Sequence, residues 1–571
     1  MTASRALGVT RIRAWSVLGL VFVAFATLAG RAVYLQYYQR EFLQDQGDDR
    51  HERLVEIPAH RGMIVDRNGE PLAISTPVDS VWVDPRQVLR DRSGLDGVAR
   101  LLDLDPEETA QRVEQRVGRE FVYLHRHVAP ALAQQVMDLD VMGVNLHREY
   151  RRYYPAGEVA GQLVGFTDID DRGQEGVELA FEDYLRGRAG SKRVIRDRLG
   201  RVIEDVEQIR PPHAGHDLRL SLDRRIQFLA YRALKGAVSR HGARSGSLVV
   251  LDPRRGEVLA MVNQPAFNPN KLDARRPRLT RNRAVTDVFE PGSTVKPFTV
   301  AAALEAGLYR PQTLVDTAPG WFVVTGHTIR DMHDYGRITV AKVISKSSNV
   351  GASKMALDMG RESLWKMFSA VGLGVASGVG LPGESTGSLP DFRHWYPLDQ
   401  ATIAFGYGVS TTTLQLAQAY MVLATGGIQR PVSLVPVETP AQGRRVLSRR
   451  VTEEVRQMME GVVSAEGTAP AAAVPGYRVA GKTGTVHKSI GGGYAKHRYV
   501  ALFAGMVPAS SPALVVVVVI DEPTRNGHYG GQVAAPAFAK VAEGALRILN
   551  IPPDATPILH RAGEGAPGGP A

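Results

Sequence analysis

One segment restricts the possible folds of this chain more than any other: residues 290–308, EPGSTVKPFTVAAALEAGL. Pro291 and Gly292 interrupt whatever precedes them, and the apolar, alanine-rich run that follows predicts a buried helix. Ser293 then lies where this helix begins, at the positive end of its dipole, and Lys296 follows on the same face. Because an adjacent amine can activate a weak hydroxyl nucleophile, the segment predicts a serine nucleophile at a helix start.

Two further motifs follow in a fixed order. Residues 347–349 read SSN and residues 482–485 read KTGT. The order S-x-x-K, S-D-N and K-T-G is a signature of serine β-lactamases and penicillin-binding proteins, although serine replaces the central aspartate here. A second S-x-x-K, residues 363–366, lies within an amphipathic pattern, so we interpret it as a solvated helix face.

With these motifs in this order, the chain resembles the class B penicillin-binding proteins, in particular the cell-division (FtsI-type) peptidoglycan D,D-transpeptidases. The resemblance covers nearly the whole chain. RGMIVDRNGEPLAIS (61–75), RRYYPAGEVAGQLVGF (151–166) and GQEGVELAFEDYL (173–185) are similar to pieces of the non-catalytic N-terminal region of this class. The resemblance implies an α+β (mixed) fold, in which a mostly antiparallel sheet is covered by helices. An elongated pedestal domain and a single transmembrane helix precede this domain.

The N-terminus predicts a membrane anchor. Residues 14–30 contain no charge, and arginines precede and follow this run. The run continues into an amphipathic segment instead of a cleavage site, which favours a retained anchor over a signal peptide. The positive-inside rule places the N-terminus in the cytoplasm and the rest outside the inner membrane. We expect a cytoplasmic N-terminus (1–13), an anchor (14–34), a pedestal (35–225), a transpeptidase domain (226–552) and a flexible tail (553–571).

The predicted transpeptidase domain has strands at both ends and helices between them. Residues 246–262 predict two strands around a tight turn, and residues 477–486, 499–507 and 513–521 predict three more before a closing helix at 534–551. This order favours one antiparallel sheet covered by helices. The resemblance implies that the KTG motif lies on an edge strand of this sheet, beside the nucleophile helix. The glycine-rich segment 487–497 predicts a flexible loop that acts as a lid.

Composition excludes other classes of function. The net charge is +10 and the chain contains no cysteine. Without a nucleic-acid-binding signature, this charge fits anionic lipid and cell-wall polymers better than nucleic acid, and thiolate chemistry is impossible. The acidic residues of the N-terminal region do not form a calcium loop, so we expect no metal and no cofactor. These acidic residues are Asp168, Asp170, Asp171, Glu175 and Glu178.

From the three motifs we expect five catalytic residues: Ser293, Lys296, Ser347, Asn349 and Lys482. Ser293 attacks a D-alanyl carbonyl, and burial together with the like charge of Lys482 lowers the pKa of Lys296 so that it can accept a proton. Ser347 relays protons to the departing amine, and Asn349 holds the substrate or orients Lys296. Lysine, Ser347 and water all stay open as the base that deprotonates Ser293.

Substrate binding is expected from Thr483, Gly484 and Thr485. The threonine hydroxyls and Lys482 receive the terminal carboxylate of the substrate. The resemblance implies that the backbone N–H groups of Ser293 and Thr485 stabilise the oxyanion. Tyr407 and Tyr529 are candidates for the walls of the cleft.

The expected function is cross-linking of septal stem peptides that end in D-Ala-D-Ala, through a serine acyl-enzyme that β-lactams also form. The alternatives are an elongation-type transpeptidase, a D,D-carboxypeptidase or β-lactamase with Glu384 as a distant candidate for deacylation, a penicillin sensor and an idle scaffold. The resemblance also implies a lipid-linked glycan polymerase of the FtsW kind and other division proteins as partners.

Overall fold

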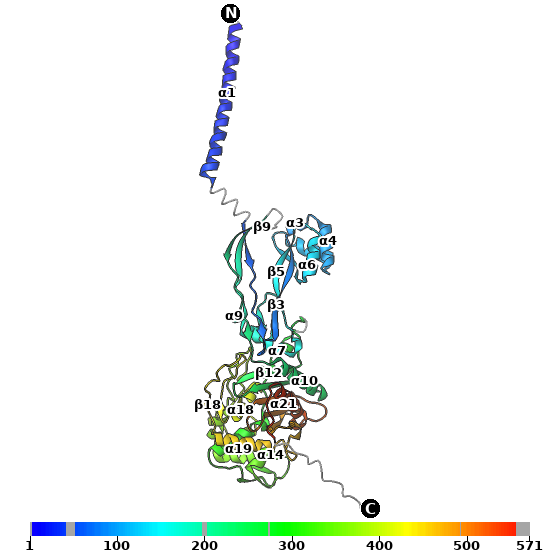
Figure 1. The fold of residues 1–571 in the computed structure, drawn as a ribbon, viewed down its shortest axis with the longest axis vertical. Coiled ribbons are helices and arrows are strands. Elements are labelled where there is room, and N and C mark those ends of the chain that lie inside the picture. Colours follow the sequence, from blue (N-terminus) through cyan, green and yellow to red (C-terminus); the bar gives the residue numbers. More distant parts are fainter. Residues whose placement is uncertain (1–2, 41–51, 197–201, 272–274, 492, 556–571) are drawn as a thin grey trace, which may run out of the picture. The chain divides into compact units, whose positions relative to one another are not determined.

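A computed structural model describes residues 3–40, 52–196, 202–271, 275–491 and 493–555 (Figure 1). Its chain divides into two compact units. Unit 1 contains residues 1–60, 77–150 and 187–214, and unit 2 contains residues 61–76, 151–186 and 215–571. The predicted tail from residue 556 onward lies outside the described residues.

Unit 1 begins with helix α1 (Ala3–Val33), which continues into a π-helical turn (Tyr34–Tyr38). The span Arg13–Tyr38 is long and apolar enough to cross a membrane, and none of it is buried in the structure. This agrees with the predicted apolar anchor, although the helix starts well before residue 14.

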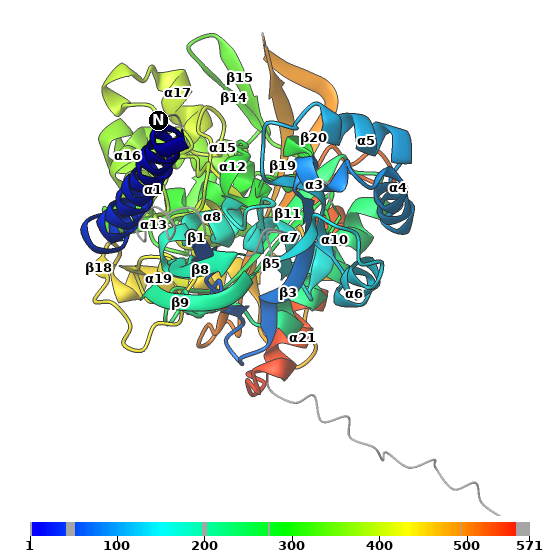
Figure 2. The same cartoon turned by 90° about the horizontal axis from the view of Figure 1, so that it is seen from above.

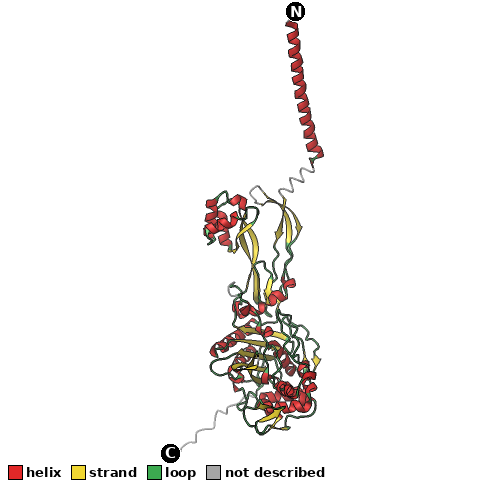
Figure 3. Cartoon of the chain, turned by 180° about the vertical axis from the view of Figure 1, so that it is seen from behind, coloured by secondary structure: helices red, strands yellow, loops and turns green. Residues whose placement is uncertain are grey.

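The rest of unit 1 contains an antiparallel three-stranded sheet and a separate helical cluster (Figure 3). The sheet consists of β1 (Glu52–Ile57), β8 (Gly190–Arg196) and β9 (Val202–Arg210). The cluster packs its apolar residues against the second part of β3 (Pro71–Val83). Its elements are α3 (Pro85–Val88), α4 (Arg92–Leu101), α5 (Pro106–Glu114), β4 (Val122–Val128), α6 (Pro130–Asp138) and β5 (Val144–Tyr153).

Unit 2 includes two segments from the N-terminal half of the chain. The turn at Asn68 and Gly69 lies in a hairpin, because β2 (Ile64–Val65) pairs antiparallel with β3 around Gly69, whose φ is +89°. Arg61 and Arg152 both bond the buried carboxylate of Glu178, at 2.8 and 2.7 Å. A buried charge is tolerated only when it is paired in this way, so the two arginines hold helix α8 (Gly176–Ala180), which carries Glu178, in place.

A five-stranded antiparallel sheet forms the centre of unit 2, in the order β12–β11–β21–β20–β19. Its strands are β11 (Ser245–Asp252), β12 (Glu257–Gln264), β19 (Ala480–Ile490), β20 (Gly493–Val507) and β21 (Leu514–Asp521). The predicted strands and the edge position of the KTG motif are therefore confirmed.

Successive residues of β11 and β21 are buried, so both faces of the sheet are covered. Helices α10 (Arg224–Arg240) and α21 (Ala535–Ile548) pack on each other and on the sheet (Figure 1). Helix α18 (Thr413–Ala424), which is buried on every side, also packs on β11, β20 and β21. The mixed fold expected from the sequence is confirmed.

Further helices lie between these elements in the chain and surround the nucleophile segment. They are α12 (Arg283–Thr286), α13 (Lys296–Glu305), α14 (Val340–Ser345), α15 (Asn349–Met359), α16 (Arg361–Ala370), α17 (Pro397–Ile403) and α19 (Arg449–Glu460). The hairpin of β14 (Trp321–Val324) and β15 (His327–Arg330) projects beside α15 and α17 (Figure 2).

One local expectation is wrong. The segment 487–497 was expected to be a flexible loop, but β19 and β20 extend through it as a paired hairpin, with Ser489 opposite Tyr494 and Ile490 opposite Gly493. The pairing of the two flanking strands continues into the segment and outweighs its glycine content.

Candidate active site

Ser293 lies on a 3-10 turn (Gly292–Val295) that runs directly into α13. The α-helix therefore begins at Lys296, one turn later than expected. Gly292 has a φ of +53°, and a Cβ there would lie 2.5 Å from Val486, so only glycine fits between the turn and the edge strand. The Ser293 hydroxyl makes no hydrogen bond with any described residue and lines an open groove.

Lys296 is completely buried on α13. Its Nζ donates to the backbone oxygen of Ser347 at 2.5 Å and to Asn349 Oδ1 at 2.7 Å. Burial lowers the pKa of Lys296 to about 7, although the nearby carboxylate of Asp331 opposes the shift. A neutral amine has two N–H donors and one lone pair. Because both donors have acceptors, the lone pair is left free to take a proton.

The hydroxyl of Ser347 lies between two lysines. Ser347 Oγ is 3.3 Å from Lys296 Nζ and 2.9 Å from Lys482 Nζ. Its backbone has a φ of +62°, which few non-glycine residues adopt. Because its hydroxyl is within hydrogen-bond distance of both amines, Ser347 can pass a proton between them.

Lys482 is also completely buried, on the edge strand β19. Burial lowers its pKa well below the usual range, and the positive charge of Lys296 lowers it further. The sequence analysis expected burial and the like charge of the other lysine to lower the pKa of Lys296. Burial does lower it, and the repulsion between the two amines disfavours a state in which both are charged.

The KTG strand approaches the nucleophile turn closely. A Cβ on Gly484 would lie 2.6 Å from Leu502 and 3.1 Å from the backbone oxygen of Pro291. The hydroxyl of Thr483 contacts that of Thr468 at 2.9 Å, and Thr485 Oγ1 accepts from the backbone N–H of Gly530 at 3.0 Å. Gly484 therefore permits the approach, and the two threonines present their hydroxyls along the groove.

A carboxylate that the motifs do not contain holds the SSN turn. Asp331, directly after β15, accepts a hydrogen bond from the hydroxyl of Ser348 at 2.5 Å and one from the backbone N–H of Val350 at 3.0 Å. It also accepts from the backbone N–H of Asn349. Sequence reasoning missed Asp331, and the only signal was the serine that replaces aspartate in the motif.

The groove above these residues has a volume of about 580 Å³. Ser293, Ser347, Asn349, Thr483 and Thr485 line it, while the two lysines lie buried beneath. Four aromatic rings line the groove: Tyr407, Tyr499, His528 and Tyr529. The sequence analysis named Tyr407 and Tyr529 as candidates for this wall. The rings of Tyr499 and His528 stack with centroids 4.1 Å apart.

Two other sequence candidates lie away from the groove. On α16, Ser363 is exposed and Lys366 pairs with Glu362 at 2.9 Å, which confirms a solvated helix face. Glu384 accepts from the backbone N–H of Ser377 at 2.7 Å and does not line the groove. It is therefore not placed to activate a water molecule at Ser293.

Two family models match the chain. The penicillin binding protein transpeptidase domain matches residues 246–543, and the penicillin-binding protein dimerisation domain matches residues 56–220. The transpeptidase match contains all three motifs.

Characterised relatives match along almost the whole length. The probable peptidoglycan D,D-transpeptidase PbpC of Pseudomonas aeruginosa is 42% identical over 94% of this chain and 95% of its own. The peptidoglycan D,D-transpeptidase FtsI of Escherichia coli K12 is 42% identical over 94% of this chain and 92% of its own. The crystal structure of penicillin binding protein 3 from Mycobacterium tuberculosis, complexed with aztreonam, is 30% identical, with a TM-score of 0.68 over 88% of this chain and 98% of that one.

Proposed function

We propose that Ser293 is the nucleophile of this chain, which belongs to the class B penicillin-binding proteins and is a peptidoglycan D,D-transpeptidase of the division (FtsI) type. The observation that carries this assignment is the hydroxyl of Ser347 held between two buried lysines, beside a groove that Ser293 lines. The substrate is a stem peptide that ends in D-Ala-D-Ala, and β-lactams acylate the same serine.

Acylation begins with proton transfer from Ser293. Neutral Lys296 takes the proton while Ser293 Oγ attacks the carbonyl carbon of the penultimate D-alanine. The negative charge that develops on the carbonyl oxygen is stabilised by the backbone N–H groups of Ser293 and Thr485. The carbonyl then reforms, and the bond to the terminal D-alanine breaks.

The proton leaves with the terminal D-alanine. Ser347 passes it from Lys296 to the amine of the departing residue, which balances the step. The carboxylate of that residue binds Lys482 and the hydroxyls of Thr483 and Thr485. A bound carboxylate raises the pKa of Lys482, so the lysine becomes charged only when substrate supplies its counter-ion. The nitrogen of an acceptor amine then attacks the acyl carbon, the ester bond to Ser293 Oγ breaks, and the proton that the amine loses returns to Ser293 Oγ.

Labelling with a fluorescent penicillin, followed by mass mapping, tests the nucleophile. We expect one modified residue, Ser293. Ser293→Ala should lose the label and keep its thermal transition, and the matched variant Ser363→Ala should label normally. Modification of Ser347 or Ser363 would refute the assignment.

The alternative of a D,D-carboxypeptidase is tested with a donor stem peptide and an acceptor amine. A transpeptidase releases D-alanine and forms a cross-linked dimer, whereas a carboxypeptidase releases D-alanine and leaves a shortened donor. The position of Glu384 outside the groove supports the first outcome.

The anchor, its orientation and the partners complete the proposal. The apolar span Arg13–Tyr38 and the arginines before it support a single inner-membrane helix with a cytoplasmic N-terminus and an external transpeptidase domain. We assign residues 14–34 to the anchor, 35–225 to the pedestal and 226–552 to the transpeptidase. A polymerase of the FtsW kind is the expected partner in the membrane. Removal of residues 1–40 should give a soluble protein that still binds penicillin.

A further inference from the structure

A second cavity, of about 230 Å³, lies between α10 and the first half of α21. The two helices pack on each other (Figure 1). The residues that line the cavity fall within 229–241 and 533–540, and none of them lines the groove that contains Ser293. This cavity, which we call the helix trough, is therefore distinct from the catalytic site.

The helix trough is open because small side chains line it. Ala233, Gly236 and Ala537 are among them, and a Cβ on Gly236 would meet no atom within 4 Å. Farther along α21 the helices are in tight contact, since a Cβ on Gly544 would lie 2.6 Å from Leu229. Residues 229–241 extend over about 18 Å along the helix axis. The free space is therefore long and narrow.

The rim of the helix trough is positively charged. Arg232, Arg240 and Lys540 line it, and no acidic residue does so among the described residues. Within the described part of the chain, none of these three cations forms an ion pair. The acidic residue nearest to Lys540 in the sequence, Glu543, bonds Arg547 at 2.5 Å. The charge of the rim is thus not balanced from within the protein.

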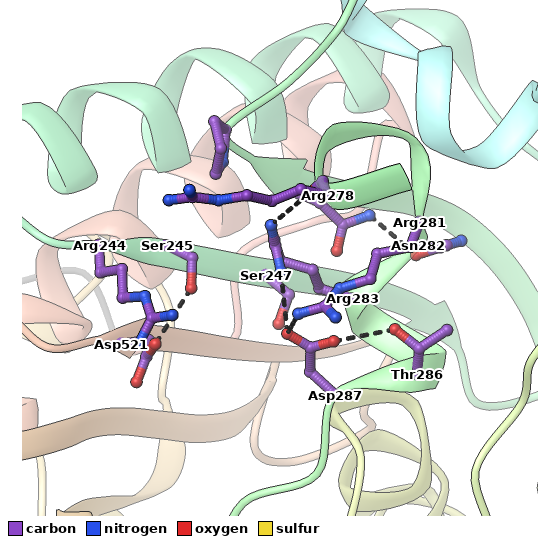
Figure 4. Close-up of polar contacts among 12 residues, drawn as sticks. Arg244, Ser245, Ser247, Arg278, Arg281, Asn282, Arg283, Thr286, Asp287 and Asp521 are labelled. Carbon is purple, nitrogen blue, oxygen red and sulfur yellow. Dashed lines mark hydrogen bonds and ion pairs between the residues drawn. The ribbon is translucent and has the colours of Figure 1, made fainter. Parts of the chain in front are cut away.

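Cations that line two other cavities of unit 2 are paired. Arg283 bonds Asp287 at 3.1 Å, as Figure 4 shows, and Arg224 bonds Glu70 at 3.2 Å. A cluster of like charges without counter-charges attracts ions of the opposite sign. The helix trough therefore favours an anion, which the other two cavities do not need.

His241 adds a buried polar group to the lining. It follows α10 directly and is only 6% exposed. Its Nδ1 lies 3.2 Å from the backbone oxygen of Arg525, and because a carbonyl oxygen only accepts, Nδ1 is the donor. Its Nε2 has no hydrogen-bond partner among the residues that the structure describes. In the protonated ring this nitrogen can donate to an anion as well.

We propose that the helix trough binds a single-chain anionic amphiphile, of the class of straight-chain carboxylic acids. The chain lies along the small side chains and against Leu229 and Val533, where its burial is favourable. The carboxylate pairs with the cations of the rim. An alkylammonium ion would face three cations and no acid, and a lipid with two chains would need a wider space.

Octanoate with a photoreactive diazirine on its chain is the probe, and the full chain in phosphatidylcholine nanodiscs is the sample. After photolysis, mass mapping locates the cross-linked peptides. We expect saturable labelling of peptides that contain residues 229–241 or 533–540. Unmodified octanoate should compete for this labelling. Octylamine, which has the same chain and the opposite charge, and propionate, which has the same charge and a short chain, should compete at least tenfold more weakly.

The composition of the nanodiscs distinguishes a free amphiphile from a membrane lipid. Inclusion of phosphatidylglycerol, an anionic lipid with two chains, should change the labelling by less than twofold. Abolition of labelling by this lipid would overturn the assignment to a single-chain ligand.

Variants of the helix trough provide the matched controls. Gly236→Leu fills the space from a position with room for a side chain, and should reduce labelling at least fivefold. The double variant Arg240→Gln and Lys540→Gln should reduce it tenfold and weaken the preference over octylamine. Arg547→Gln, which removes a positive charge of α21 outside the lining, should label normally.

All these variants should still react with penicillin, because none of the changed residues lines the catalytic groove. That reaction shows that each variant is folded. Labelling confined to other peptides, equal competition by octylamine, or normal labelling of a folded Gly236→Leu protein would overturn the proposal.

Discussion

Asp331 accepts a hydrogen bond from Ser348, the residue that replaces the aspartate of the S-D-N motif, and so places a carboxylate beside this motif. The hydroxyl of Ser348 donates to Asp331 at 2.5 Å, and the same carboxylate accepts from the backbone at the start of α15. Negative charge at a helix N-terminus is favourable, so the bond fixes both the turn and the helix. It thereby positions Ser347 and Asn349 against Lys296.

Asp331→Asn is expected to slow acylation on the order of 100-fold, because a small displacement of catalytic groups has effects of that size. It should also lower the pKa of Lys296, since the Asp331 charge raises that pKa in the native enzyme. The acidic limb of the pH–rate profile should therefore move to lower pH. Fluorescent-penicillin kinetics across pH measure both effects.

Ser348→Ala is the control for this prediction. It removes the hydrogen bond but keeps the charge, so acylation should slow while the acidic limb stays in place. If both variants shifted the limb equally, the charge of Asp331 would not be the cause.

The pH dependence of acylation should follow Lys296. Its reactive form is the neutral amine, and the fraction in that form grows as the pH rises through about 7. The acylation rate should therefore increase with pH, reach half of its maximum near this value and level off above it. Stopped-flow measurements from pH 5 to 9 check the profile.

Lys296→Arg tests the same assignment by chemistry. A guanidinium group stays charged in a protein, so it cannot accept the proton. The rate should fall by about 10²- to 10⁴-fold at every pH, the usual contribution of a general base. Near-normal acylation by this variant would remove Lys296 from the role of base and leave Ser347 or water.

The sequence was sufficient to find the residues that carry the motifs. Ser293, Lys296, Ser347, Asn349 and Lys482 could be named because each motif contains its own spacing, and the structure brings them together. The five-stranded sheet was also predictable, since β11, β12, β20 and β21 each contain a continuous apolar run and β19 carries the KTG motif.

The contacts between distant segments were not predictable. Asp331 acts on a turn that lies in another element, and no local pattern marks it. The complete burial of both lysines depends on the packing of the whole domain, which no local pattern encodes. The hairpin at residues 487–497 was missed because its glycines were weighted above the strand pairing of its flanks.

Replacement of Lys482 should weaken binding of the donor peptide more than it changes the pKa of Lys296. Burial lowers the pKa of Lys482 well below the usual range and disfavours the charged form, so replacement of this lysine removes less positive charge than the loss of an ordinary lysine would. Lys482→Gln should raise KM for the donor peptide by about 10- to 100-fold, the worth of a hydrogen bond to a charged group. The acidic limb of the pH profile should stay near 7.

Lys482→Arg is the companion variant. It keeps a positive charge but not the compact ammonium, so binding of the carboxylate should be partly retained while acylation slows. A pH limb that moved upward in Lys482→Gln would show that Lys482 is charged in the free enzyme, contrary to this prediction.

Gly484→Ala tests the contact between the edge strand and the nucleophile turn. The added methyl would lie 2.6 Å from Leu502, 3.0 Å from Thr294 and 3.1 Å from the backbone oxygen of Pro291. Because the last of these is backbone, the strand must move away from the turn, at a cost of about 1–3 kcal/mol. Acylation should slow about tenfold or more, since Thr485 moves away from Ser293.

Gly491→Ala is the matched control on the same strand hairpin, because a Cβ there meets nothing within 4 Å. Thermal unfolding and penicillin acylation of both variants decide the matter: normal acylation by Gly484→Ala would show that the turn and the strand adjust independently.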